Sequence, residues 1–352
     1  MSVFSNRKLQ QFHYAMNTKF ISPRRFCAKY MTLICVLCAL FCRTTPLHSQ
    51  EGVTLHQGLI EHGWRIEHLP QNTEGESCVT LRLNRSISPE HLEADLAAIS
   101  AFDQVTCLIF ENGLSLSSHH LDIITSITSL TELRFVGTGQ IDPKGHLPFS
   151  INDLNKLEKL QNLTVLCIED WPFSDQNSSD SGCLKAEGFG KLSLKSLSIK
   201  GSRFSKNDLE LVSKMVSLQT LTLTAEVDGV TFQEIAHCSS SLKNLRLLVV
   251  YASGLISNKS FREFVTIVNG NAHKVSLVFD HVDTKATFQG ICLEDEIARI
   301  SRLSDVYLHS CTFSAQLLDV LTKEQKDRSS PCFNIYVTNV QRNIINASEE
   351  VR

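Results

Sequence analysis

The chain has 352 residues, of which 42% are hydrophobic and 20% are charged, and its formal net charge is -3. These values are ordinary for a globular protein and allow one large domain or two average ones. A charge close to neutrality, without blocks of Lys or Arg, gives no electrostatic basis for binding nucleic acid or an anionic membrane surface. We therefore expect no nucleic-acid partner.

The first 49 residues (1–49) have the pattern of a targeting segment. Residues 1–30 are polar and basic, residues 31–42 are predominantly apolar, and Arg43 ends the run. A basic region, a short apolar core and a polar exit are typical of a secretory signal, and we expect cleavage after Ser49. The apolar run is shorter than the roughly 20 residues that span a bilayer. Two alternatives stay open, a retained membrane anchor at 31–42 and a soluble leader on a cytoplasmic protein.

The cysteines do not form a regular pattern. Of the 12 in the chain, four lie near the N-terminus, at Cys27, Cys35, Cys38 and Cys42. The others are scattered, which argues against a dense disulfide framework. Cys35 and Cys38 form a C-x-x-C inside the apolar run, and a redox or metal role needs a folded, polar setting.

Residues 50–77 are mostly polar and are predicted to form an irregular N-terminal cap or linker. The first strand is predicted at residues 79–83, where apolar and polar residues alternate. A helix is predicted to follow, because Ser88 can serve as its N-cap and Pro89 suits the first helical position.

The stretch 193–223 shows a repeating unit most clearly. It opens with Leu194, Leu197 and Ile199, and it closes with the same spacing in Leu218, Leu221 and Leu223. About nine such units are predicted, with strands near residues 79–83, 105–110, 130–135, 163–168, 194–199, 218–223, 245–250, 275–279 and 303–308, and a closing strand at 333–337. In the unit at 275–279 the buried pair is either Val275 with Leu277 or Leu277 with Phe279.

The units recur every 24 to 33 residues or so, a spacing found in repeat proteins with one strand and one helix per unit. One unit buries little surface alone, so stacked units would form a parallel sheet with helices packed outside it. A doubly wound α/β fold fits less well, because its strands are continuous apolar runs. Residues 78–340 are therefore predicted to be one α/β repeat domain, followed by a polar tail at 341–352.

The repeats resemble those of leucine-rich repeat proteins, and the long units are most similar to the ribonuclease-inhibitor-like, cysteine-containing subclass. The best match runs through Leu303, Val306, Leu308 and Cys311. The resemblance implies a horseshoe solenoid with a parallel sheet on the concave face and helices on the convex face. The family usually places Asn or Cys eight residues after the first Leu. Only Cys311 conforms, and the other units have Thr138, Trp171, Ser202, Glu226 and Ser253.

Side chains between the buried leucines are expected to point onto the concave face. One row is predicted to hold Arg82, Arg134, Cys167, Ser198, Thr222, Val249, Tyr307 and Tyr336. The next row is predicted to hold Asn84, Glu111, Glu169, Lys200, Thr224, Tyr251, Asp280 and His309. Solenoids bind partners on such faces, and Tyr is enriched at binding hot spots. The predicted protein-binding residues are Arg82, Arg134, Glu169, Lys200, Val249, Tyr251, Tyr307, His309 and Tyr336.

Metal binding and catalysis are not indicated by the sequence. The pairs His119-His120 and His237-Cys238 have no second pair at ligand spacing. There is no G-x-S-x-G, phosphate loop, H-E-x-x-H or catalytic cysteine motif. We therefore expect no cofactor, no metal and no enzyme activity.

Five N-x-S/T sequons occur, at Asn84, Asn162, Asn177, Asn258 and Asn346. They would be glycosylated only if the host modifies such sites in its secretory pathway. Asn177 lies in a Ser/Asp-rich loop and is the best placed of the five, whereas a glycan on Asn84 would block the concave face.

The leading hypothesis is an exported leucine-rich repeat protein that acts as a non-catalytic protein-binding scaffold through its concave face. The alternative is a target-recognition subunit or secreted effector that recruits proteins to a separate enzyme such as a ubiquitin ligase complex. Membrane contact is expected only through a retained segment 31–42.

Overall fold

The computed structural model describes residues 57–68, 79–84, 87–111, 116–137, 149–171, 188–201, 206–225, 230–253, 256–280, 293–309, 312–313, 334–338 and 341–342. The chain divides into two compact units, Met1–Gly58 and Leu59–Arg352. All the helices and strands named below belong to the second unit. The predicted leader 1–49, with its apolar run, lies outside the described residues.

The second unit is an α/β array built on one large sheet. Its 11 strands follow one another in chain order, and all except the first pair in parallel. They are β1 (Trp64–His68), β2 (Val79–Leu83), β3 (Val105–Glu111), β4 (Glu132–Val136), β5 (Val165–Glu169), β6 (Ser196–Lys200), β7 (Thr220–Ala225), β8 (Leu247–Ser253), β9 (Lys274–Asp280), β10 (Leu303–His309) and β12 (Asn334–Thr338). Two short strands, β11 (Thr312–Phe313) and β13 (Gln341–Arg342), pair with each other.

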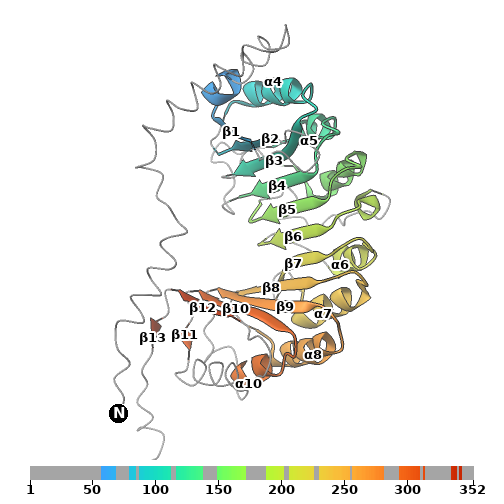
Figure 1. The fold of residues 1–352 in the computed structure, drawn as a ribbon, viewed down its shortest axis with the longest axis vertical. Coiled ribbons are helices and arrows are strands. Elements are labelled where there is room, and N and C mark those ends of the chain that lie inside the picture. The colour runs from blue at the N-terminus through green and yellow to red at the C-terminus, as the bar shows by residue number, and fades with distance from the viewer. Residues whose placement is uncertain are drawn as a thin grey trace, which may run out of the picture. The chain divides into compact units, whose positions relative to one another are not determined.

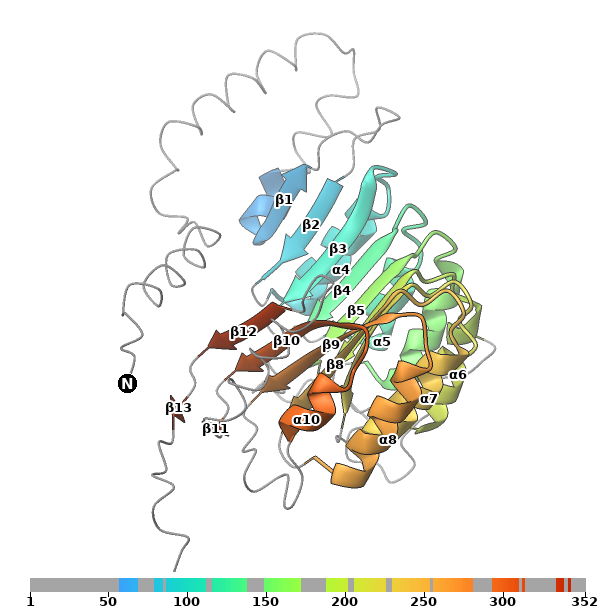
Figure 2. The same ribbon diagram turned by 60° about the horizontal axis from the view of Figure 1, so that its bottom comes forward.

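Helices alternate with the strands along the chain. They are α4 (Pro89–Ile99), α5 (Ser118–Ile124), α6 (Lys206–Val212), α7 (Phe232–Ser241), α8 (Asn258–Asn269) and α10 (Leu293–Ala298), with the 3₁₀ helices η1 (Ile151–Lys159) and η2 (Phe189–Lys191). Figure 1 and Figure 2 show α5 to α8 side by side along one face of the sheet. The predicted alternation of parallel strands and helices is confirmed. We call the opposite face, on which no described helix lies, the helix-free face.

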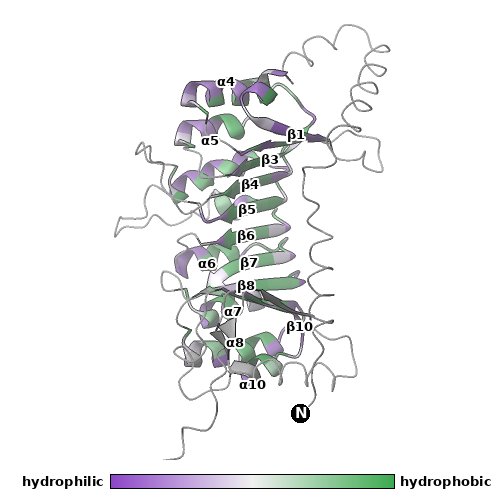
Figure 3. Ribbon diagram, turned by 90° about the vertical axis from the view of Figure 1, so that its left-hand side faces the viewer, coloured by the Kyte–Doolittle hydropathy of each residue, from purple (hydrophilic) through white to green (hydrophobic). Residues whose placement is uncertain are grey.

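The core lies between the sheet and the helices, because alternate strand residues point to opposite faces. In β6 and β7, Leu197, Ile199, Leu221 and Leu223 point toward the helices and are at most 3% exposed. Figure 3 shows apolar residues running through the successive strands from β3 to β8. The L-x-x-L-x-L spacing therefore predicted the buried side of β6 and β7.

Side chains close the starts of the helices. Ser88 is the N-cap of α4 and Pro89 is its first residue, as predicted. In α7, Thr231 and Glu234 form a capping box, in which each side chain accepts a hydrogen bond from the other's backbone N–H. These caps satisfy backbone donors that an isolated helix leaves unpaired.

A ladder of polar side chains links neighbouring repeats where the strands begin. Asn162 donates to the Thr128 carbonyl at 2.9 Å, and Asn244 donates to the Val216 carbonyl at 2.7 Å. Ser129 and Ser217 make equivalent bonds to the Val105 and Leu194 carbonyls. Each of these residues comes immediately before the first leucine of its unit. The ladder thus lies at a different place from the Asn/Cys position typical of leucine-rich repeat proteins.

Trp171 occupies that Asn/Cys position in its unit. Its ring is fully buried and packs against Phe135 and Phe149, with ring centroids 5.3 and 5.7 Å apart. At this unit an apolar core contact replaces the polar one. Thr138, Ser202, Glu226 and Cys311 lie outside the described residues.

The start of the array is closed by a strand that the sequence did not predict. β1 falls within the region 50–77, predicted to be irregular, and pairs antiparallel with β2. Trp64 is 2% exposed, and its indole N–H donates to the Asp95 carboxylate at 2.8 Å. His62 contacts the other oxygen of Asp95, also at 2.8 Å. One carboxylate of α4 therefore fixes the antiparallel strand to the first repeat.

The register of the sheet slips between β9 and β10. Val275, Leu277 and Phe279 are all buried, so both core pairs considered from the sequence face inward. Val275 pairs with Leu248, whereas Val306 of β10 pairs with Leu277, two residues further along β9. An irregularity between Leu303 and Asp305 takes up the difference. Because β9 has an apolar residue at every inward position, it accommodates both neighbours.

Candidate protein-binding surface

The strand register defines two rows of side chains across the helix-free face. The first row is Arg82, Ile109, Arg134, Cys167, Ser198, Thr222, Val249, Ser276, Asp305 and Asn334. The second row is Glu111, Val136, Glu169 and Lys200, continued beyond β7 by Tyr251, Val278, Tyr307 and Tyr336. The expectation that Tyr307 and Tyr336 share a row with Val249 is wrong, because the slip at β10 moves them into the row of Tyr251.

At the N-terminal end of this face, the predicted arginines are engaged within the protein. The Arg82 guanidinium lies 2.8 Å from Glu111 on the next strand and 3.8 Å from Glu67 on β1. Arg134 forms an ion pair with Glu132 on its own strand. These pairs neutralise the arginines in place, so this end offers no excess of positive charge to a partner.

The middle of the face carries Cys167, Glu169 and Ser198. The Cys167 thiol and the Ser198 hydroxyl each lie 3.4 Å from one Glu169 carboxylate oxygen. Burial, with the adjacent Glu169 charge, raises the pKa of Cys167 to about 12. Burial raises the pKa of Cys107, also on this face, to about 11. Both thiols therefore stay protonated and are poor nucleophiles at neutral pH.

The C-terminal end of the face carries Tyr251, Val278, Tyr307 and Tyr336 on four adjacent strands, and we call this set the tyrosine row. The rings of Tyr307 and Tyr336 stack with centroids 4.5 Å apart and planes 8° apart. Tyr307 is 38% exposed, among the most exposed large hydrophobic side chains of the described residues. This arrangement places rigid aromatic surface where a partner can reach it.

Lys200 extends from β6 toward the tyrosine row. Its ammonium nitrogen lies 4.7 Å from the centroid of the Tyr251 ring, within the range of a cation–π contact. Burial raises the pKa of Tyr251, and the Glu169 carboxylate adds to the effect. Burial also raises the pKa of Tyr307, reinforced by Asp305. The phenols are therefore neutral at physiological pH and act as hydrogen-bonding aromatic groups.

The remaining predicted binding residues lie beside the tyrosine row. Val249 is half-buried and pairs with Thr222 and Ser276. His309 pairs with Asp280 across β10 and β9, at the C-terminal ends of these strands. The structure thus brings Lys200 to Tyr251 and Tyr307 to Tyr336, whereas Arg82 and Arg134 lie on strands nearer the N-terminal end of the face.

The sequons differ in their accessibility. Asn162 is exposed in the turn before β5, and Asn84 is half-buried directly after β2. Asn258 is the first residue of α8. Asn177 and Asn346 lie outside the described residues. Of Asn84 and Asn162, Asn162 is the more exposed.

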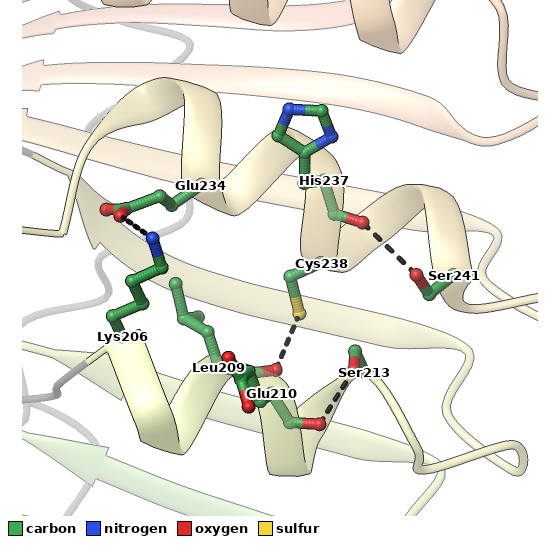
Figure 4. Close-up of a pocket in the computed structure, with 8 residues that line it drawn as sticks. All are labelled: Lys206, Leu209, Glu210, Ser213, Glu234, His237, Cys238 and Ser241. Carbon is green, nitrogen blue, oxygen red and sulfur yellow. Dashed lines mark hydrogen bonds and ion pairs between the residues drawn. The ribbon is translucent and has the colours of Figure 1, made fainter.

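A hollow lies on the helix side, between α6 and α7. It has a volume of about 270 Å³ and is lined by Lys206, Leu209, Glu210, Ser213, Glu234, His237, Cys238 and Ser241. Lys206 and Glu234 form an ion pair across it at 3.3 Å. Figure 4 shows the His237 ring directed away from the Cys238 thiol, which contacts the Leu209 carbonyl at 3.5 Å. Burial raises the pKa of Cys238 to about 12, so this hollow holds no activated nucleophile.

One constellation of Ser, Lys and Asp looks like catalytic machinery but connects two helices. Lys156 of η1 donates to the Ser118 hydroxyl at 2.6 Å and to Asp122 at 2.7 Å, and Ser118 donates to Asp153 at 2.5 Å. Burial raises the pKa of Asp153, but hydrogen bonds from Ser118 and Ser150 outweigh it and lower the pKa overall. Asp153 is therefore a weak base, and the Lys156 ammonium is held between Asp122 and Asp153. The cluster is better explained as a structural link between α5 and η1 than as a catalytic site.

The described residues contain no cluster of three or more His, Cys, Asp or Glu side chains that could hold a metal ion. His119 is exposed, whereas His120 is buried and caps its own helix. Within the same part of the chain, no helix has the length and apolar character needed to cross a bilayer.

Comparison with models of known protein families gives no match. Comparison with curated proteins also gives no match. We therefore infer function from the geometry and chemistry of the chain's own residues.

Proposed function

We propose that this chain is an exported leucine-rich repeat protein that binds another protein, without catalysis, through the helix-free face of its sheet. In this proposal the array is a horseshoe solenoid, the helix-free face is its concave side, and the tyrosine row is the centre of the contact. The observation that carries the proposal is that row, because it combines stacked aromatic rings, exposure and a rigid sheet.

Physical reasons support this part of the surface over the others. Tyrosine provides a large contact area at a low cost in side-chain entropy, and it is enriched among residues that dominate binding energy. The strand backbones beneath Tyr307 and Tyr336 are paired, so little ordering is needed when a partner arrives. The arginines at the other end are already paired within the protein, and breaking those pairs would cost energy.

Site-specific photo-crosslinking tests the proposal. A photoreactive phenylalanine would replace Tyr307 in one protein and Val216 in another, because Val216 is 69% exposed before β7, away from the tyrosine row. We expect a discrete partner to crosslink at position 307 and to be displaced by excess unmodified protein. Equal crosslinking at position 216, or displacement by a Tyr307→Ala/Tyr336→Ala protein, would refute the binding site.

Export is tested separately by mass spectrometry of the mature N-terminus. We expect the mature chain to start at Gln50, after removal of residues 1–49. A chain that starts at Met1 would contradict a cleaved signal while leaving the proposed binding surface untouched.

A further inference from the structure

The tyrosine row lies in an acidic part of the helix-free face. The charged residues around it are the carboxylates of Glu169, Asp170, Asp280 and Asp305 and the ammonium groups of Lys200 and Lys274. Carboxylates therefore outnumber ammonium groups four to two in this part of the described surface. Aromatic side chains within a field of net negative charge favour a cationic ligand.

The acidic residues are held in place by the backbone and by neighbouring groups. Asp170 adopts a left-handed conformation with φ of 48°, and its N–H donates to the Lys200 carbonyl at 2.7 Å. Gly201, directly after Lys200, has φ of 65°, and a Cβ there would lie 1.8 Å from an Asp170 carboxylate oxygen. Asp305 accepts hydrogen bonds from Ser276 and Asn334 at 3.1 and 2.9 Å. The negative field is thus part of a rigid surface.

The row already accommodates a cation within the protein. The Lys200 ammonium lies over the Tyr251 ring, on which the Glu169, Asp170 and Asp280 carboxylates also act. The stacked pair Tyr307 and Tyr336 is further along the same row, and Tyr307 is exposed. The cation–π contact of Lys200 with Tyr251 is therefore the type of contact that Tyr307 and Tyr336 can offer to a partner.

We propose that the partner presents a basic segment and that an arginine side chain of this segment stacks on the Tyr307–Tyr336 pair. This inference rests on the proposed function and specifies the chemistry of its partner. Arginine fits better than lysine, because its planar guanidinium stacks on an aromatic ring and can donate two parallel hydrogen bonds to a nearby carboxylate.

The test uses the full chain and a fluorescein-labelled peptide with four arginines separated by glycines. In the control peptide each arginine is replaced by citrulline, which has nearly the same shape without the charge. Fluorescence anisotropy would measure both affinities at 50 and 300 mM salt. We expect the citrulline peptide to bind at least about tenfold more weakly, and salt to weaken only the arginine peptide.

Variants then locate the contact. Tyr307→Ala should weaken arginine-peptide binding about tenfold, whereas Tyr307→Phe, which keeps the ring, should retain it. Glu169→Gln with Asp280→Asn should also weaken binding, most strongly at low salt. Val216→Ala, at an exposed position away from the tyrosine row, is the matched control and should have no effect. Far-UV circular dichroism would confirm that each variant is folded.

Equal affinity for the two peptides, or equal effects of Tyr307→Ala and Val216→Ala, would overturn the inference. The two proposals fail separately. A partner that crosslinks at position 307 but is not displaced by the arginine peptide contradicts the basic-segment proposal and leaves the proposed function standing. Ring-dependent peptide binding without any crosslinked protein supports a cation-binding row and counts against the scaffold.

Discussion

Two histidines are buried in the described part of the chain, and burial lowers the pKa of each. Burial lowers the pKa of His120, whose Nδ1 accepts the Ser117 backbone N–H at 2.9 Å and so closes the start of α5. Burial, together with the Arg302 charge, lowers the pKa of His273. Both rings are therefore neutral in the folded protein at pH 7, and protonation of either one opposes folding.

The first prediction concerns acid sensitivity. A lowered pKa in the folded state means that the unfolded chain binds more protons below about pH 6.5, so stability falls as pH falls through this range. His120→Gln keeps an acceptor for the Ser117 N–H and removes the titrating group. We expect urea unfolding midpoints of this variant to depend less on pH between 7 and 5 than those of the wild type.

A second variant serves as a check on the histidine prediction. Because His273 contributes in the same direction, the double variant His120→Gln/His273→Gln should show the flattest pH dependence. If the wild type, the single variant and the double variant have the same slope, buried histidines do not control stability in this range.

At the scale of elements, the attachment of β1 depends on one carboxylate. Asp95 accepts hydrogen bonds from the buried Trp64 indole and from His62, and its side chain is 8% exposed. Since β1 is the one antiparallel strand of the large sheet, its loss would expose the edge of β2. Exposed strand edges pair readily with other chains.

The second prediction therefore removes this carboxylate. Asp95→Ala leaves a buried indole N–H without its acceptor, and we expect a loss of about 3 kcal/mol in the free energy of unfolding. Asp103→Ala, at an exposed position after the same helix, should change it by less than about 0.5 kcal/mol. Denaturant unfolding followed by circular dichroism measures both, and equal losses would show that Asp95 has no special role.

The strands were largely predictable from the sequence, but the composition of the tyrosine row was not. The predicted strand 79–83 matches β2, and the closing strand predicted at 333–337 lies one residue from β12. Leucine spacing predicts which side of a strand is buried. It cannot fix how two strands align when, as in β9, Val275, Leu277 and Phe279 allow either register.

Two other features were missed for identifiable reasons. β1 is short, and its alternation through Trp64, Arg65, Ile66 and Glu67 covers too few residues to stand out within the mostly polar region 50–77. The Asn and Ser ladder has a signal, a polar residue directly before the first leucine of a unit, at Ser129, Asn162, Ser217 and Asn244. The resemblance to leucine-rich repeat proteins predicts polar residues at the other end of the strand instead.

At the scale of the whole repeat unit, each strand contacts only its neighbours in the chain order. Stability in such arrays is approximately a sum of terms within repeats and between adjacent repeats. The chain has two tryptophans, Trp64 and Trp171, and both are buried in the N-terminal half of the sheet. Tryptophan fluorescence therefore reports on that half alone, whereas far-UV circular dichroism reports on all repeats.

The third prediction uses this separation. Leu308→Ala in β10 and Leu108→Ala in β3 each remove a side chain that is at most 1% exposed, and each should cost about 2–5 kcal/mol locally. With Leu308→Ala, we expect the circular dichroism transition to begin before the fluorescence transition. With Leu108→Ala, fluorescence should change first. Coincident transitions in both variants would indicate one cooperative unit.

The slip between β9 and β10 also determines which insertions and deletions this fold can accept. The tyrosine row depends on the strand register, since Tyr251 lies before the slip and Tyr307 lies after it. Whole repeats before β5 could be gained or lost without disturbing this row or the charged residues around it, because each repeat depends only on its neighbours. A residue inserted or deleted within β10 between Leu303 and Val306, where the irregularity lies, would instead change the alignment of Tyr307 with Tyr251.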